Sequence, residues 1–214
     1  MRRSKTQKIK DFITFPARAF TLFHEDRFGL SSLASERFDY AAAEVTGYCL
    51  DIGCAYGNRF VKEYLNGGGI GIDLFPYEGL TEENIIPDFT HLPYEDKVFD
   101  SVTFIASINH APESQRDAEL AEAWRVLKPG GNIILTMGLP IVELIVHRVV
   151  WFYDRFLGTR VDMDSERGME EGEAYFLTED EIRERLTRAG FKRVIRKPFV
   201  TQWGMNRLYV GWKE

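Results

Sequence analysis

Apolar positions along the chain fall into two patterns, short continuous runs and longer segments with helical spacing. Short apolar runs are typical of strands that a sheet buries on both faces. The segments between them repeat their apolar residues every three to four positions, as amphipathic helices do. The predicted strands are residues 48–52, 70–73, 85–86, 98–105, 132–137, 191–197 and 206–212, with helices predicted at 58–65, 113–127 and 179–189. Strands that alternate with helices indicate an α/β fold.

A glycine-rich turn follows the first predicted strand. Gly53 and Gly57 allow a sharp turn and a close approach of a ligand, which a Cβ would block. Asn58 is the expected N-cap of the next helix. A strand that enters a helix through such a turn presents backbone N–H groups at the carboxyl edge of the sheet, where open α/β folds bind ligands. A purely structural turn is the alternative.

Asp51, two positions before the first glycine, indicates which kind of ligand the turn binds. A carboxylate there would repel a diphosphate, and the spacing G-x-A-x-G fits neither a dinucleotide fingerprint nor a P-loop. A ligand with an ammonium group suits it better. The stretch YCLDIGCAYGNRF resembles the first motif, D/E-x-G-x-G-x-G, of the class I S-adenosylmethionine-dependent methyltransferases. Ala55 stands in place of the middle glycine.

Further segments carry the same resemblance. Asp73 ends the second predicted strand 22 positions after Asp51, close to the offset at which an acid reaches ribose hydroxyls; an Asp that only faces water is the alternative. The segment DFTHLPYEDKVFDSVTF resembles the family pattern in which Asp88 accepts from the adenine amine and Phe89 covers the base. The run AEAWRVLKPGGNIILT is similar to the segment before strand five in small-molecule methyltransferases of the ubiquinone/menaquinone type.

The resemblance implies a Rossmann-like, seven-stranded sheet of order 3-2-1-4-5-7-6, with the seventh strand antiparallel and helices on both faces. It also implies S-adenosyl-L-methionine as the cofactor. The cofactor-binding residues that it implies are Asp51, Gly53, Cys54, Ala55, Gly57, Asn58, Asp73, Leu74, Asp88, Phe89 and Ala106.

His110, after the fourth predicted strand, is the candidate general base, because an unperturbed imidazole titrates near neutral pH. The alternative is a histidine that orients cofactor or acceptor. In this family the insertion after strand five builds the substrate cap, here about 139–175, where His147 and Trp151 are expected to contact an apolar acceptor; ordinary core packing is the alternative. Residues 1–46 are expected to form a helical lid or cap segment, and 47–214 the methyltransferase domain.

The N-terminus is basic, and Pro16 is expected to interrupt any single long helix there. Packing on the domain or a lid is favoured over contact with an anionic surface. The net charge of −6 over 214 residues gives no global attraction for nucleic acid or an anionic membrane. No apolar stretch is long enough to span a bilayer, and no signal peptide is evident.

Cys49 and Cys54 form neither a disulfide framework nor a zinc spacing, which suits a reducing cytoplasm. Residues 162–173 imitate an EF-hand loop, but Arg167 occupies the glycine position, so no metal site is expected. A homodimer is left open.

The sequence thus predicts transfer of a methyl group to a small, apolar acceptor. A non-catalytic S-adenosylmethionine-binding regulatory protein is the alternative. A nucleic-acid methyltransferase is disfavoured because Ser-Ile-Asn-His, and not Asn-Pro-Pro-Tyr, follows strand four and the net charge is negative. A dehydrogenase is the weakest rival.

Overall fold

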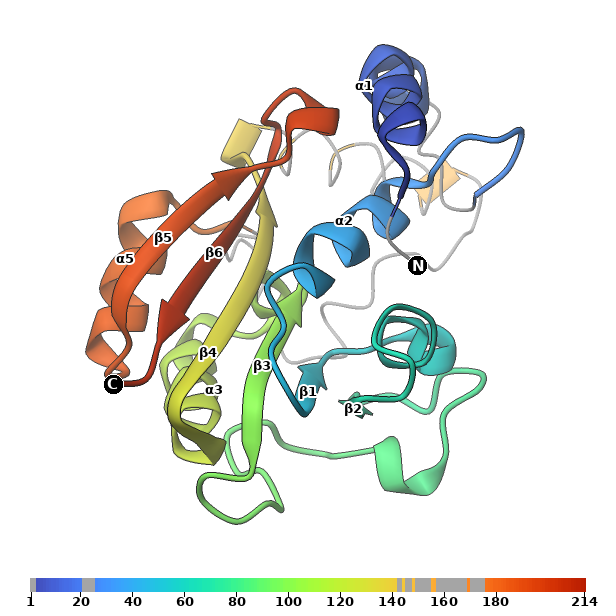
Figure 1. Ribbon diagram of the computed structural model, residues 1–214. Coiled ribbons are helices and arrows are strands. Elements are labelled where there is room, and N and C mark those ends of the chain that lie inside the picture. The colour runs from blue at the N-terminus through green and yellow to red at the C-terminus, as the bar shows by residue number, and fades with distance from the viewer. Residues whose placement is uncertain are drawn as a thin grey trace.

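The computed structural model describes residues 3–20, 26–141 and 176–214, together with Leu144, Arg148, Arg155, Phe156 and Met169. Its centre is one mixed sheet of order β2-β1-β3-β4-β6-β5 (Figure 1). The pairs β1–β2, β1–β3 and β3–β4 are parallel, whereas β6 runs antiparallel to both β4 and β5. The strands are β1 (Cys49–Ile52), β2 (Gly69–Ile72), β3 (Phe99–Ile105), β4 (Leu127–Gly138), β5 (Lys192–Pro198) and β6 (Asn206–Trp212).

Helices cover both faces of the sheet, as expected. On one face α3 (Glu113–Val126) and α5 (Glu179–Arg188) pack over a large apolar core that includes Ile133 and Leu135 of β4. On the other face α2 (Leu33–Ala42) and the short helix η2 (Phe60–Tyr64) cover a second cluster that includes Ile134. Successive residues of one strand therefore enter different cores, as the two-residue period of a strand requires.

Side-chain caps define the starts of two helices. Ser32 is the N-cap of α2, and its hydroxyl accepts from the backbone N–H of Ser35. Thr178 and Glu181 form a reciprocal capping box at the start of α5.

The third predicted strand, at 85–86, is where the sheet differs from the prediction of seven strands. Within the described residues the sheet has six strands, and Ile85 forms only an isolated parallel bridge with Asp73. The one-turn helix η3 (Glu82–Asn84) ends just before this segment, and Pro87, which has no N–H, follows it. Only two residues are left for pairing, so the ladder does not propagate. The order of the other six strands agrees with the prediction.

The helix predicted after the glycine turn is also different. A 3₁₀ turn, η1 (Tyr56–Asn58), precedes η2, which is a single π-helical turn. Asn58 is not an N-cap: it has φ 51°, and its buried Oδ1 has no hydrogen-bond partner among the described residues. This left-handed residue breaks the helix where the sequence pattern suggested continuity.

Pro16 does not interrupt the N-terminal helix, and that expectation was wrong. α1 (Lys5–Phe20) continues through it. A proline removes the hydrogen bond to the carbonyl four residues earlier, here that of Phe12. The indole Nε1 of Trp203 donates to that carbonyl oxygen at 2.9 Å and replaces the lost bond. A side chain nearly 190 residues away in sequence therefore makes the continuous helix possible.

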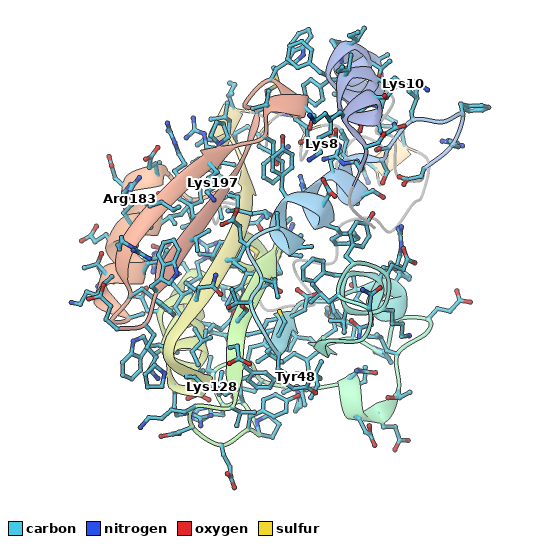
Figure 2. The ribbon with its side chains drawn as sticks, viewed as in Figure 1. Lys8, Lys10, Tyr48, Lys128, Arg183 and Lys197 are labelled. Carbon is cyan, nitrogen blue, oxygen red and sulfur yellow. The ribbon has the colours of Figure 1, made fainter. Side chains whose placement is uncertain are left out.

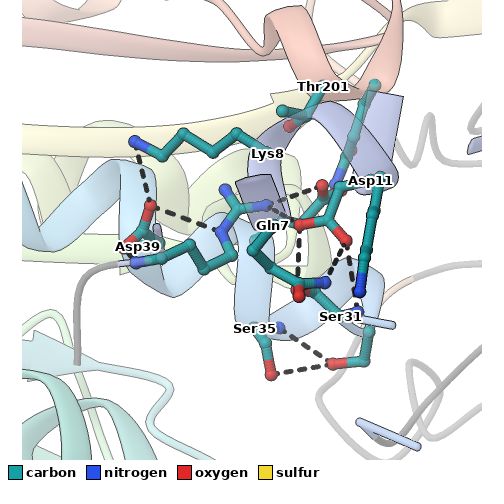
Figure 3. A network of polar contacts seen from close by, with 12 residues as sticks. Gln7, Lys8, Asp11, Ser31, Ser35, Asp39 and Thr201 are labelled. Carbon is teal, nitrogen blue, oxygen red and sulfur yellow. Dashed lines mark hydrogen bonds and ion pairs between the residues drawn. The ribbon is translucent and has the colours of Figure 1, made fainter. Parts of the chain in front are cut away.

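A buried polar network fixes α1 to α2 (Figure 3). Arg3 lies at its centre, with Nη1 at 2.7 Å from carboxylate oxygens of both Asp11 and Glu36 and Nε at 3.3 Å from Asp39. The guanidinium of Arg18, which is 1% exposed, donates to the carbonyl oxygens of Asp11 and Ser31. Charges removed from water to this degree are tolerated because each is paired and hydrogen-bonded.

Candidate active site

The turn after β1 lies over the carboxyl end of β2. The N–H groups of Gly53 and Cys54 both donate to the carbonyl of Ile72, at 2.8 and 3.0 Å, and Gly57 N–H donates to the carbonyl of Glu78. Gly53 has φ 80°, and a Cβ added there would lie 2.5 Å from Cβ of Ser107. A glycine is therefore required, because the loop after β3 presses against the turn.

Ala55 occupies a conformation that favours glycine. Its φ of 51° and ψ of −154° lie in a region that residues with a Cβ rarely adopt. Its N–H donates to Oδ2 of Asp73 at 2.9 Å, which holds the turn in this shape. The alanine thus keeps the backbone path of the glycine that it replaces.

Asp51 and Asp73 are brought together beneath this turn. Both carboxylates are buried, and Asp51 Oδ1 accepts from the hydroxyl of Thr103 at 2.6 Å. Burial raises the pKa of Asp51 to about 7, against the Thr103 hydrogen bond, which lowers it; the negative charge of Asp73 adds to the rise. A cationic group placed near Asp51 would reverse this shift.

Asp88 lies apart from these two acids. It is exposed, and its oxygens accept from Thr90 N and Oγ1 at 2.7 Å and lie 3.0 Å from Nδ1 of His91. These contacts, the Thr90 hydroxyl first and then His91, lower the pKa of Asp88. Its neighbour Phe89 is buried, and Phe89 and Leu74 both line a groove at this edge.

An apolar recess adjoins that groove at the ends of β1 and β3. Leu74 and Phe89 line both spaces, and His110 lines the recess from the one-turn helix η4 (Ile108–His110). Gln115 and Glu119 of α3 also line both. The sequence pattern did not single out these two residues, but they are one helical turn apart and follow closely after His110, a spacing that could have identified them.

Buried Arg116 supports the loop that carries His110. Its Nε donates to the carbonyl of Ala111 at 2.9 Å and its Nη2 to that of Asn109 at 3.3 Å. Both neighbours of His110 in the chain are thereby fixed. Ala106, at the end of β3, has φ 52°, so the chain turns sharply as it leaves the sheet.

Of the remaining predicted site residues, the structure describes Cys54 but not His147 or Trp151. Cys54 and Cys49 are buried free thiols, and burial, followed by the charge of Asp51, raises the pKa of each well above its usual range. His147 and Trp151 lie outside the described residues. Among the residues that are described, no group of three His, Cys, Asp or Glu side chains could hold a metal ion.

Known proteins resemble this chain in sequence and in fold. Residues 50–135 match the family model described as a methyltransferase domain. A ubiquinone/menaquinone biosynthesis C-methyltransferase from Brucella anthropi is 29% identical over 153 residues, which cover 68% of this chain and 57% of the relative. Over this region the chain is similar to the class I S-adenosylmethionine-dependent methyltransferases. It spans little more than half the length of this curated relative.

Solved structures agree on the fold of the methyltransferase domain. A Thermotoga maritima S-adenosylmethionine-dependent methyltransferase, described as a possible histamine N-methyltransferase, has a TM-score of 0.60 at 17% identity and covers 97% of this chain and 100% of its own. A putative methyltransferase in complex with the Haloferax volcanii Trm112 activator has a TM-score of 0.59 at 19% identity, covering 95% and 96%.

The described residues fit the cofactor of this family. Gly53 and Gly57 add no side chain to the turn, two buried carboxylates lie beneath it, and an apolar recess begins beside Leu74 and Phe89. An adenosine with an amino-acid arm needs these three environments: acceptors for the ribose and ammonium groups, and an apolar slot for the base.

Proposed function

We propose that this protein transfers the methyl group of S-adenosylmethionine to an oxygen, carbon or nitrogen atom of a small, apolar acceptor. The observation that carries the proposal is the continuity of the glycine turn, the acids Asp51 and Asp73, and the apolar recess beside His110 at one edge of the sheet. When bound, the cofactor supplies a methyl group on a sulfonium centre, which is already an activated leaving group.

The chain's own residues would bind and orient. Asp51 would face the ammonium group of the amino-acid arm, Asp73 would accept from the ribose hydroxyls with its remaining lone pairs, and Leu74 and Phe89 would enclose the base. Asp88 Oδ1 accepts twice from Thr90, whereas Oδ2 contacts His91 and keeps a second lone pair that would accept from an adenine amine. Placement in line supplies much of the acceleration of such a transfer.

His110 is the residue proposed to meet the acceptor. It lines the recess, and Arg116 fixes the carbonyls on both sides of it, so its ring has a defined location. In that position it would accept the acceptor's proton or hydrogen-bond the acceptor. His147 and Trp151, with the surrounding insertion at about 139–175, are proposed to complete the acceptor site.

The cytoplasm is the proposed location. Both cysteines of the chain are reduced and buried, which supports a reducing compartment. Among the described residues, no helix is long and apolar enough to cross a membrane.

Calorimetric titration with S-adenosylhomocysteine tests the proposal, followed by a methyl-transfer screen of apolar phenols, quinones and lipids. Wild type is expected to bind, and Asp73→Ala is expected to weaken binding at least tenfold because two or more hydrogen bonds are lost. Asp180→Asn, an exposed acid on α5, is the control and should bind as wild type does.

Failure of wild type to bind at millimolar ligand, or tighter binding of NAD, would overturn the assignment. Replacement of Trp151 by Ala distinguishes the acceptor site: acceptor binding should weaken more than cofactor binding, and an equal loss of both would refute the cap.

A further inference from the structure

Helix α1 buries Phe15 together with charged side chains, and it exposes other apolar side chains that a surface helix normally buries. Its inward face carries Asp11 and Arg18, which are 0% and 1% exposed and belong to the buried polar network (Figure 3). A surface helix normally turns its apolar stripe to the core and its charges to water. Here the polar network attaches the helix to α2 and leaves the apolar stripe on the outside.

The outward stripe consists of Ile9, Phe12 and Ile13, which are 62%, 44% and 68% exposed. Positions separated by three and four residues lie on the same side of a helix, so these side chains form one continuous strip. Single exposed apolar residues need no explanation, but a contiguous strip of this size on a folded chain indicates a contact surface.

A neighbouring loop extends the strip. The ring of Trp203 lies 6.1 Å from that of Phe12 and 5.8 Å from that of Phe15, and it is still 52% exposed. Trp203 follows η6 (Val200–Gln202), in which Val200 is also exposed. Tryptophan is enriched where proteins meet the interface of a bilayer, because its ring is apolar and its N–H is polar. We call Ile9, Phe12, Ile13, Val200 and Trp203 the outer apolar face.

Lysines border this face. The exposed charged side chains of α1 are Lys5, Lys8 and Lys10, and Lys8 and Lys10 lie roughly 100° to either side of Ile9 around the helix. Figure 2 shows Lys10 at the end of the molecule opposite Lys128 and Tyr48. Lys8 also lies 3.6 Å from Asp39, whereas Lys5 and Lys10 extend to solvent. The face is thus locally basic on a chain whose net charge is −6.

We propose that the outer apolar face docks the protein on the surface of an anionic phospholipid bilayer. Apolar side chains would enter the boundary between headgroups and acyl chains, and the bordering lysines would meet lipid phosphates. This meets the requirement for two signals, apolar burial and basic charge, in stable peripheral binding. A second copy of the chain fits less well, because a two-fold contact through α1 would bring both sets of lysines to one rim.

Co-sedimentation of the full chain with vesicles tests this, and it needs no cofactor or turnover, so its outcome is separate from that of the proposed function. Wild type is expected to sediment with mixed phosphatidylcholine–phosphatidylglycerol vesicles and much less with phosphatidylcholine alone. Ile9→Ser combined with Ile13→Ser should reduce the partition coefficient about tenfold or more. Lys5→Glu combined with Lys10→Glu should reduce the partition coefficient by about fivefold or more for each lysine replaced. Added salt should weaken vesicle binding of wild type in the same way.

Lys192→Glu is the matched control, because Lys192 is an exposed lysine on β5 at the other end of the sheet. It should bind vesicles nearly as wild type does. All variants replace exposed side chains, so their melting temperatures should match that of wild type and report that folding is intact. Wild type that stays in the supernatant with anionic vesicles would overturn the proposal. So would unchanged binding of the Ile9/Ile13 variant, or a wild-type dimer that this variant dissociates.

Discussion

Ala55 shows how one side chain alters a motif without changing its path. The residue holds φ 51° and ψ −154°, a conformation that costs a residue with a Cβ about 1–3 kcal/mol. The bond from its N–H to Asp73 keeps it there. The turn is therefore strained at the position where related motifs carry glycine.

Replacement of Ala55 by Gly should stabilise the protein. Relief of the strain exceeds the extra entropy that glycine gives the unfolded chain, so we expect a net gain of about 1 kcal/mol in the free energy of unfolding. Chemical denaturation measures it. Ala121→Gly, at an exposed position inside α3, is the control and should lose about 1 kcal/mol. A loss at both positions would show that Ala55 is unstrained.

The pKa of Asp51 predicts a pH dependence of stability. An Asp in the unfolded chain ionises near pH 4, whereas burial raises the pKa of Asp51 to about 7 in the folded state. Between these values the unfolded state binds fewer protons than the folded state, so wild type should lose stability as pH rises from about 4 to 7. Asp51→Asn should lack this decline, and the difference between the two free energies of unfolding should level off above pH 7. Parallel curves would contradict the burial argument.

At the residue scale the sequence identified the acids at the ends of the first two strands, because their spacing depends only on the strand–turn–helix unit. It could not identify Thr103 or Ser107, which reach Asp51 and Gly53 from a neighbouring strand and its loop. Asn58 was misassigned because capping preferences report composition, and its positive φ comes from packing in the turn. The roles of Asp88 and His110 stay predictions.

Among the elements, α1 shows why proline rules apply only locally. A proline inside a helix leaves one carbonyl without its partner, and the rule assumes that no other donor is near. Trp203 supplies that donor. The short segment at 85–86 is the opposite case: its pattern suggested a strand, but η3 and Pro87 leave it a single bridge. The longer elements β3 and α3 were placed within one residue, whereas β4 begins at Leu127, five residues before the predicted strand.

A double-mutant cycle tests the contact between Trp203 and α1. Trp203→Phe keeps an aromatic ring against Phe12 and Phe15 but removes the donor to the Phe12 carbonyl, and should cost about 1 kcal/mol of unfolding free energy. In a Pro16→Ala background the residue-16 N–H can donate to that carbonyl, so the same change should cost less. Equal costs in the two backgrounds would show that the indole bond does not compensate for the proline.

At the scale of the whole molecule, buried charges join the N-terminal helix to α2. Arg3 contacts three carboxylates from α1 and α2 within 3.3 Å, and the side chains involved are almost fully buried. A buried ion pair contributes little against an apolar replacement, but removal of one partner leaves its counter-charges without compensation. The position of α1 should therefore depend strongly on the Arg3 guanidinium.

Arg3→Met should lower the free energy of unfolding by about 3 kcal/mol and open residues 3–20 to proteolysis. Lys5→Met, at an exposed lysine two positions away, is the control and should change stability by less than about 0.5 kcal/mol. Denaturant titration and limited trypsin digestion provide the measurements. If both variants resist digestion as wild type does, the helix is attached by its apolar contacts with Trp203 and not by the network.

The two buried cysteines allow the opening of the glycine turn to be measured by alkylation, without an introduced probe residue. Cys49 lies inside β1 and Cys54 in the glycine turn, and burial keeps both as neutral thiols, which are poor nucleophiles. Alkylation at each sulfur therefore requires its surroundings to open. The alkylation rate of Cys54 would report the opening of the turn, and that of Cys49 the opening of the sheet. The ratio of the two rates therefore compares how often the ligand-binding turn and the sheet open.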